Sequence, residues 1–154
     1  MPSDKLGYME EFDLALARKE GLAQSVYFQA LKTPSSVAII EENIEITYGE
    51  LHSRAAILAR RLHLKAFELD EPVGIVVQHG VADILTQMAT LYAGGTCVPM
   101  DPTLPDPQIQ GLLQRLRSRY VLVDKANARD LPFRLIAVDS WRRENLGFWM
   151  QDFP

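Results

Sequence analysis

The chain has 154 residues, of which 47% are hydrophobic, which is enough to bury a core without disulfide bonds or a structural metal. Its net charge of −4, from 16 basic and 20 acidic residues, excludes the basic surface that nucleic-acid binding needs, and no apolar run is long enough to span a membrane. Cys97 is the only cysteine, so no intrachain disulfide can form, and the first residues lack the pattern of a secretory signal. We therefore expect one cytoplasmic domain, residues 1–154, with no nucleic-acid or membrane partner.

Two helices and a hairpin are predicted in the first third of the chain. Apolar residues at helical spacing predict an amphipathic helix within the first twenty residues: Leu6, Met9, Phe12 and Leu16. A second helix is expected over residues 22–31, ended by Pro34. Residues 37–40 and 44–47 then form two strands joined by a polar turn, which is the pattern of a β-hairpin.

The next helix has a clear start. Thr47 and Glu50 form a capping box, in which each side chain accepts a hydrogen bond from the other residue's backbone amide. One apolar face follows, made of Leu51, Ala55, Leu58 and Leu62. The charged and imidazole side chains of this helix are expected off that face or on the surface: His52, Arg54, Arg61, His63 and Lys65.

The second half of the chain alternates strands with helices. Strands are predicted at residues 72–77, 96–98, 120–123 and 135–138. One helix ends at Gly94-Gly95 and is expected to turn Ile84, Leu85, Met88 and Leu91 inward. Another begins at Asp106-Pro107, with the aspartate as N-cap, and is expected to turn Ile109, Leu112, Leu113 and Leu116 inward. This alternation predicts an α/β fold, a mostly parallel sheet with helices on both faces and residues 73–77 as a central strand.

Two motifs in this order and spacing carry a family resemblance. Residues 46–51, Ile-Thr-Tyr-Gly-Glu-Leu, and residues 91–102, Leu-Tyr-Ala-Gly-Gly-Thr-Cys-Val-Pro-Met-Asp-Pro, resemble the first two core motifs of the adenylate-forming superfamily. That superfamily includes peptide-synthetase adenylation domains, acyl-CoA synthetases and luciferases. Residues 26–124 resemble its amino-terminal subdomain, with Tyr92 in place of the usual lysine and Cys97 in place of the usual tyrosine.

The resemblance also indicates what this sequence lacks. The family holds ATP phosphates with a Ser/Thr/Gly-rich loop that ends in Pro-Lys-Gly, and it uses a lysine in a later domain for catalysis; neither is found here. We therefore expect no bound cofactor, and a truncated, free-standing adenylation-like protein of secondary-metabolite biosynthesis that cannot adenylate. It would act as an accessory or binding protein beside a biosynthetic enzyme. The alternative is a recruited cofactor-independent cyclase or isomerase that acts on an apolar natural product.

Two residues are candidates for catalysis if the chain is an enzyme. His79 follows the strand at residues 72–77, where open α/β sheets bind their ligands, and it titrates near neutral pH. Asp101 follows the next strand and could act as a general base. The structural interpretations are an exposed loop histidine and an aspartate that caps a turn, and both are the more common outcomes. Cys97 is expected to be buried, and the histidine spacing predicts no metal site.

The tail is the last feature of the sequence. Residues 141–154 contain four large aromatics, Trp141, Phe148, Trp149 and Phe153. A lobe of an adenylating enzyme without its neighbours would expose apolar surface, which soluble proteins rarely do. We therefore expect a two-fold homodimer in which this tail, the first helix or both cross the interface, with a pocket for an apolar ligand at the seam.

Overall fold

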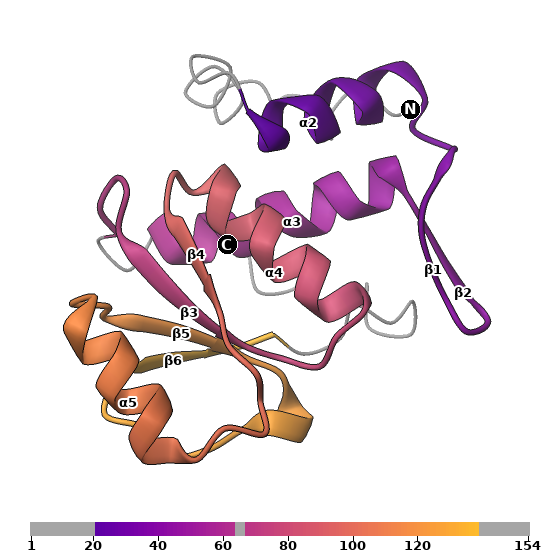
Figure 1. The fold of residues 1–154 in the computed structure, drawn as a ribbon. Coiled ribbons are helices and arrows are strands. Elements are labelled where there is room, and N and C mark those ends of the chain that lie inside the picture. Colours follow the sequence, from indigo (N-terminus) through magenta and orange to yellow (C-terminus); the bar gives the residue numbers. More distant parts are fainter. Residues whose placement is uncertain (1–20, 64–66, 139–154) are drawn as a thin grey trace.

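The computed structural model describes residues 21–63 and 67–138. The first predicted helix and the aromatic tail lie outside these residues. The described elements are α2 (Leu22–Lys32), β1 (Val37–Glu41), β2 (Ile44–Thr47), α3 (Tyr48–His63), β3 (Pro72–Val76), α4 (Val81–Tyr92), β4 (Thr96–Pro99), α5 (Asp106–Arg115), β5 (Tyr120–Val123), the short 3-10 turn η2 (Lys125–Asn127) and β6 (Arg134–Ala137). Figure 1 shows how they are arranged.

The main sheet has four strands in the order β4-β3-β5-β6, and every neighbouring pair is parallel. This confirms the α/β prediction and the central position of β3. In register, Gly74 of β3 lies between Val98 of β4 and Val121 of β5. The predicted hairpin is also confirmed, as a separate antiparallel pair of β1 and β2.

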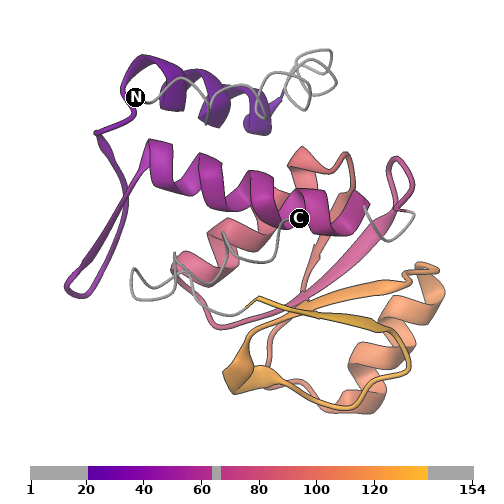
Figure 2. The ribbon, with the colours of Figure 1, turned by 180° about the vertical axis from the view of Figure 1, so that it is seen from behind.

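Helices cover both faces of this sheet, as the two views show (Figures 1 and 2). Val73, Ile75 and Val77 point into the core beneath α3 and α4, whereas Val76 points to the other face, which α5 covers. Gly74 lets α5 approach closely, because a Cβ there would lie only 2.9 Å from a methyl carbon of Leu113. The helices α2, α3 and α4 pack against one another on the first face.

Both predicted helix-end signals are present. The Thr47 amide donates to the Glu50 carboxylate at 2.9 Å, and the Glu50 amide donates to the Thr47 hydroxyl at 3.2 Å, which completes the capping box. At the end of α4, Gly94 has a φ of 80°. The Gly94 amide donates to the carbonyl of Leu91, and the Gly95 amide donates to that of Thr90. This pattern is a Schellman motif, and it satisfies the last carbonyls of the helix.

Several predictions of burial are wrong. His52 and Arg54 of α3 are buried rather than on the surface, because α3 packs against α2 as well as α4 and so buries more than one face. Three residues predicted to point inward are at least 40% exposed: Ile84, Leu112 and Leu116. These three residues lie to the side of the buried residues through which α4 and α5 pack against the sheet. Asp106 is the first residue of α5 rather than its N-cap, which is Pro105.

His52 has a partner from the neighbouring helix. Its Nδ1 lies 2.7 Å from the hydroxyl of Tyr92, and the ring of Tyr27 stacks nearby at 5.2 Å between centroids. Its Nε2 is buried and has no hydrogen-bond partner among the described residues. Burial lowers the pKa of His52 to about 4, so the imidazole is neutral at physiological pH. The pair joins α3 to α4 through side chains that are both almost fully buried.

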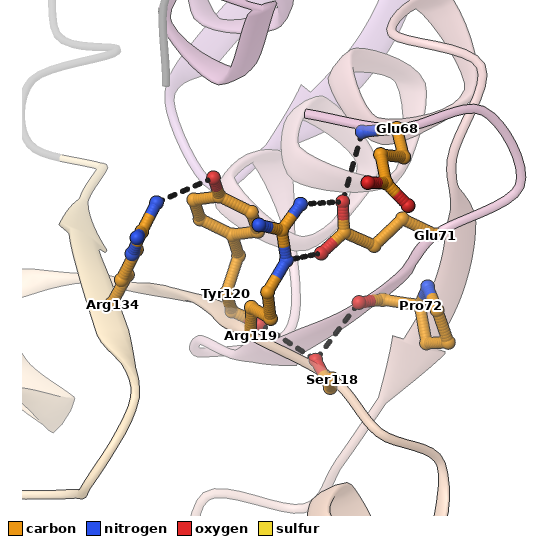
Figure 3. A network of polar contacts seen from close by, with 7 residues as sticks. All are labelled: Glu68, Glu71, Pro72, Ser118, Arg119, Tyr120 and Arg134. Atoms are coloured by element: carbon orange, nitrogen blue, oxygen red, sulfur yellow. Dashed lines mark hydrogen bonds and ion pairs between the residues drawn. The ribbon is translucent and has the colours of Figure 1, made fainter. Parts of the chain in front are cut away.

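A polar network holds the amino ends of the strands together (Figure 3). Glu71 lies just before β3, and its two carboxylate oxygens accept bonds from Arg119, before β5, at 2.6 and 2.9 Å. The Ser118 hydroxyl donates to the carbonyl of Pro72 at 2.8 Å. Arg134 of β6 donates to the hydroxyl of Tyr120 at 3.1 Å. These contacts tie β3, β5 and β6 together at this edge.

Within residues 21–63 and 67–138, no helix combines the length and the apolar character needed to cross a bilayer.

Candidate functional site at the carboxyl edge

Three adjacent strands end at the same edge of the sheet, and a polar residue follows each of them. His79 follows β3, Asp101 follows β4 and Asp124 follows β5. Open parallel sheets bind ligands outside this edge, where loops meet beyond the strand ends. The fold therefore brings the two predicted residues, His79 and Asp101, to the same edge. It adds Asp124, which the sequence prediction missed.

His79 is the most accessible of the three. Its side chain is 88% exposed, and its Nδ1 lies 3.4 Å from the carboxylate of Asp83, one turn into α4. That distance is at the long end for a hydrogen bond, so the contact orients the ring only weakly. The structure therefore places His79 as an exposed loop histidine, the more common of the two interpretations.

Asp101 closes its own turn. Its Oδ1 accepts hydrogen bonds from the Thr103 amide at 2.8 Å and from the Thr103 hydroxyl at 2.7 Å. These two bonds hold the pKa of Asp101 below its usual value, and the nearby charge of His79 lowers it further. The carboxyl group is therefore ionised at neutral pH, and it serves as the turn cap that the sequence favoured.

Asp124 bridges two loops of this edge. One of its carboxylate oxygens accepts from the Gln78 amide at 2.9 Å, just beyond β3. The other accepts from the amide of Asn127 at 3.0 Å and from its side chain at 2.6 Å, which caps η2. An aspartate between a buried strand and a short polar segment is a recognisable cap pattern, so local sequence could have identified its role.

Arg129 fixes the proline-rich loop that follows β4. Its guanidinium donates to the carbonyls of Pro102 at 2.7 Å and Leu104 at 3.3 Å, and it pairs with Asp106 at 3.1 Å. The side chain is only 17% exposed. No local motif marks this arginine, because its contacts with the proline-rich loop and Asp106 lie more than twenty residues earlier in the chain.

The hairpin reaches this edge as well. Gly80, after His79, has a φ of 121°, and a Cβ there would fall 1.7 Å from a carboxylate oxygen of Glu41. Only glycine fits this position, because it tolerates both the left-handed backbone and the close carboxylate. The carboxyl edge thus carries Asp83 and Asp101 near the exposed imidazole of His79, and Glu41 beside Gly80.

The described residues contain neither a metal-binding cluster nor a reactive thiol. Over residues 21–63 and 67–138, no group of three or more histidine, cysteine, aspartate or glutamate side chains is placed to hold a metal ion. Cys97 is half-buried on β4, and burial raises its pKa to about 11. The thiol is therefore protonated at neutral pH and a poor nucleophile.

The chemistry available at the edge follows from these contacts. Asp101 and Asp124 already accept hydrogen bonds from the loops at this edge, so of the residues His79, Asp101 and Asp124 it is His79 whose side chain is left most exposed to solvent.

Comparison with known proteins gives the chain its family. Residues 26–145 match the family of AMP-binding enzymes. The chain belongs to this family. The match confirms the resemblance seen in the two core motifs and extends it beyond residue 124.

The chain is similar to several fungal proteins. The chain is 55% identical over 140 residues to the aldehyde reductase lnaA of Aspergillus flavus, which covers 90% of this chain and 13% of that protein. It is 51% identical over 132 residues to the non-canonical nonribosomal peptide synthetase hkm10 of Aspergillus hancockii, covering 85% of this chain and 13% of that protein. The chain thus spans about an eighth of the length of these relatives.

Solved structures of adenylating proteins share the fold. The nonribosomal peptide synthetase FmoA3 in its AMPPNP-bound form matches with a TM-score of 0.73 and 24% identity, over 77% of this chain and 13% of that one. The N-terminal subdomain of NpsA from Klebsiella oxytoca, in complex with anthranilyl-AMSN, matches with a TM-score of 0.66 and 20% identity, over 75% of this chain and 30% of that one.

Proposed function

We propose that this chain is a structural lobe of an adenylate-forming enzyme of secondary metabolism, and that it works by binding the remainder of such an enzyme rather than by adenylating alone. It would supply the sheet and helices against which the nucleotide-binding part of the enzyme packs.

The carboxyl edge of the sheet carries this proposal. Asp101 and Asp124, the carboxylates best placed for chemistry, accept hydrogen bonds from Thr103, Gln78 and Asn127 of the loops at this edge. Arg129, a cation at the same edge, bonds to the proline-rich loop. These groups stabilise the loops, whereas the transfer of AMP needs cations and amides directed at a phosphate.

The sequence supports the same proposal. It contains no Ser/Thr/Gly-rich loop ending in Pro-Lys-Gly, with which this family holds ATP phosphates. The relatives named above are about eight times longer than the matched segment, so most of each relative has no counterpart in these 154 residues. We place the enzyme in secondary metabolism because its relatives include a nonribosomal peptide synthetase as well as the aldehyde reductase.

Reconstitution in two pieces tests the proposal. The 154-residue protein would be mixed with lnaA from which the matching 140 residues have been deleted, and carboxylate-dependent ATP–pyrophosphate exchange would be measured over a panel of amino and aryl acids. Each piece alone should give background exchange, and the mixture should give exchange and co-elute in size-exclusion chromatography. Exchange by the 154-residue protein alone would contradict the proposal, as would failure of the two pieces to bind.

A second candidate function rests on the proximity of His79 and Asp101. The two lie close enough for the charge of one to lower the pKa of the other. An exposed imidazole beside a carboxylate could serve a cofactor-independent cyclase or isomerase with an apolar substrate. The variant His79→Ala with Asp101→Asn separates the two functions. As a structural lobe it should reconstitute exchange as well as the wild type, whereas an isomerase should lose turnover of metabolites from neighbouring biosynthetic steps.

A further inference from the structure

The two outermost strands of the main sheet differ in what their outer sides present. In the described part of the chain, β4 and β6 are these strands (Figure 1). On β4, the amides of Thr96 and Met100 donate to carbonyls in or next to β3. Backbone groups alternate between the two sides of a strand, so Cys97 and Pro99 face outward. Pro99 has no N–H to donate, and proline in this position protects a sheet from the addition of another strand.

The outer side of β6 has no such protection. The amides of Arg134 and Val138 donate to carbonyls next to or in β5, so these two residues face β5. By the same alternation, Leu135 and Ala137 face away from β5, and each has both an N–H and a C=O. Within residues 21–63 and 67–138, no strand pairs with β6 on this side. The backbone of Leu135 and Ala137 is therefore a template for one more strand.

One face of β6 is also incompletely covered. Ile136 and Val138 are buried in the core beneath α3 and α4. Leu135 points to the other face, where it lies in register with the buried Val121, yet it is 37% exposed. Parallel sheets are normally covered on both faces. A partner that adds a strand to β6 would therefore also contact the side chain of Leu135.

The size of this surface favours the remainder of an enzyme over a second copy of the chain. A stable dimer buries roughly 800 Å² on each partner, which is more than a strand of four residues and one exposed leucine supply. The relatives are about eight times longer than the matched segment, so they have enough chain to cover a larger area. We propose that a strand from the remainder of an adenylate-forming enzyme pairs with the outer side of β6 and covers Leu135. This assignment rests on the function proposed above.

Amide exchange followed by NMR tests the outer side of β6 residue by residue. In the 154-residue protein alone, the amides of Leu135 and Ala137 should exchange fast and those of Ile136 and Val138 slowly, because the latter two face β5. Addition of lnaA that lacks the matching 140 residues should slow exchange at Leu135 and Ala137 by about tenfold or more. Fast exchange at these two positions in the complex would overturn the proposal. So would slow exchange in the isolated protein, since the chain itself or a second copy would then occupy this side.

A matched pair of substitutions at one exposed position tests the same contact by affinity. Ala137→Pro removes the outward N–H and places ring carbons there, whereas Ala137→Val keeps the N–H. Pro99 occupies the equivalent last position of β4, so the sheet accepts an outward-facing proline. Unchanged amide exchange in β3 would verify that both variants fold. In isothermal titration calorimetry with the same lnaA piece, Ala137→Pro should raise the Kd by about tenfold or more, and Ala137→Val should leave it near the wild-type value.

The outcomes separate this inference from the function on which it rests. If the two variants bind the lnaA piece with equal affinity, the strand pairing is wrong, but the structural role of the lobe stands. If the wild-type protein does not bind the lnaA piece at all, both proposals fail.

Discussion

The two edges of the parallel sheet are built in opposite ways. At the amino edge, Glu71 is 6% exposed in its side chain and binds Arg119 through two hydrogen bonds, which join residues 48 apart in the sequence. At the carboxyl edge, the Asp101 carboxylate bonds to Thr103, two residues on, and the side chain of His79 is almost fully exposed, while Asp124 and Arg129 bond between loops. The amino edge is held by a buried ion pair between strands, whereas the carboxyl edge is held by hydrogen bonds within and between its loops.

This difference separates stability from function in the fold. Contacts between distant strands resist unfolding, so substitutions at the amino edge should cost stability. Loops that satisfy their own hydrogen bonds can change without loosening the sheet, and functional residues concentrate on such loops. The amino edge should therefore respond to substitution in melting experiments, and the carboxyl edge in binding or activity.

The largest expected effect is at the strand that both edges share. Ile75 is 1% exposed at the centre of β3, so Ile75→Asp would bury a charge without a partner. We expect the protein to lose its cooperative thermal transition and its near-ultraviolet circular dichroism. A soluble variant that still melts cooperatively would show that folding does not depend on the burial of Ile75 in β3.

The second effect depends on pH and arises in the helix layer. Folded His52 has a pKa of about 4, below the ordinary value of 6.5, so the unfolded chain binds a proton in this range that the folded protein does not. Stability should therefore be complete above pH 6.5 and fall by about 3 kcal/mol as the pH drops to 4. Urea unfolding at several pH values measures this slope. His52→Gln should flatten it, and an unchanged slope in that variant would assign the effect to other groups.

The third effect tests the amino edge directly. Arg119→Met removes the guanidinium and leaves the buried carboxylate of Glu71 with the Glu68 amide as its one donor in the described part of the chain. We expect the melting temperature to fall by about 4 °C or more. The control is Arg117→Met, two residues away on the surface, which should melt as the wild type does. Equal melting temperatures for the two variants would mean that the ion pair contributes nothing measurable.

The smallest effect is expected at the carboxyl edge. His79→Ala should leave the melting temperature at its wild-type value, because its side chain is 88% exposed and makes one long contact. Thermal denaturation followed by circular dichroism at pH 7 checks this. A clear drop in melting temperature would mean that the carboxyl edge also carries stability, and the contrast between the edges would then fail.

Local signals in the sequence predicted most of the fold. The Thr47–Glu50 capping box and the turn at Gly94 depend on neighbours within a few residues, and both are present as expected. Alternation of strands and helices was enough to place β3 at the centre of the sheet. The aspartate turn at Asp101 was also predicted, since its partner Thr103 is two residues away.

The errors came from contacts between distant parts of the chain. His52 and Arg54 are polar residues whose burial depends on another helix, and nothing local shows that α2 packs over α3. Arg129 was missed for the same reason, because it bonds to a loop more than twenty residues earlier. Leu112 has the spacing of a buried residue, but the buried residues of α5 are Ile109 and Leu113. Periodicity identifies an apolar face without saying how much of it a neighbour covers.

The bond between His52 and Tyr92 has a consequence for sequence variation in this family. The two residues lie in or next to the two core motifs, forty positions apart, and Tyr92 stands where the family usually has lysine. An ammonium group in place of the Tyr92 hydroxyl would be disfavoured, because burial penalises its charge and the neutral imidazole supplies no negative charge to offset that penalty. The two positions should therefore covary. Sequences with lysine at position 92 should carry a carboxylate, an amide or a small residue at position 52, and histidine there should accompany tyrosine.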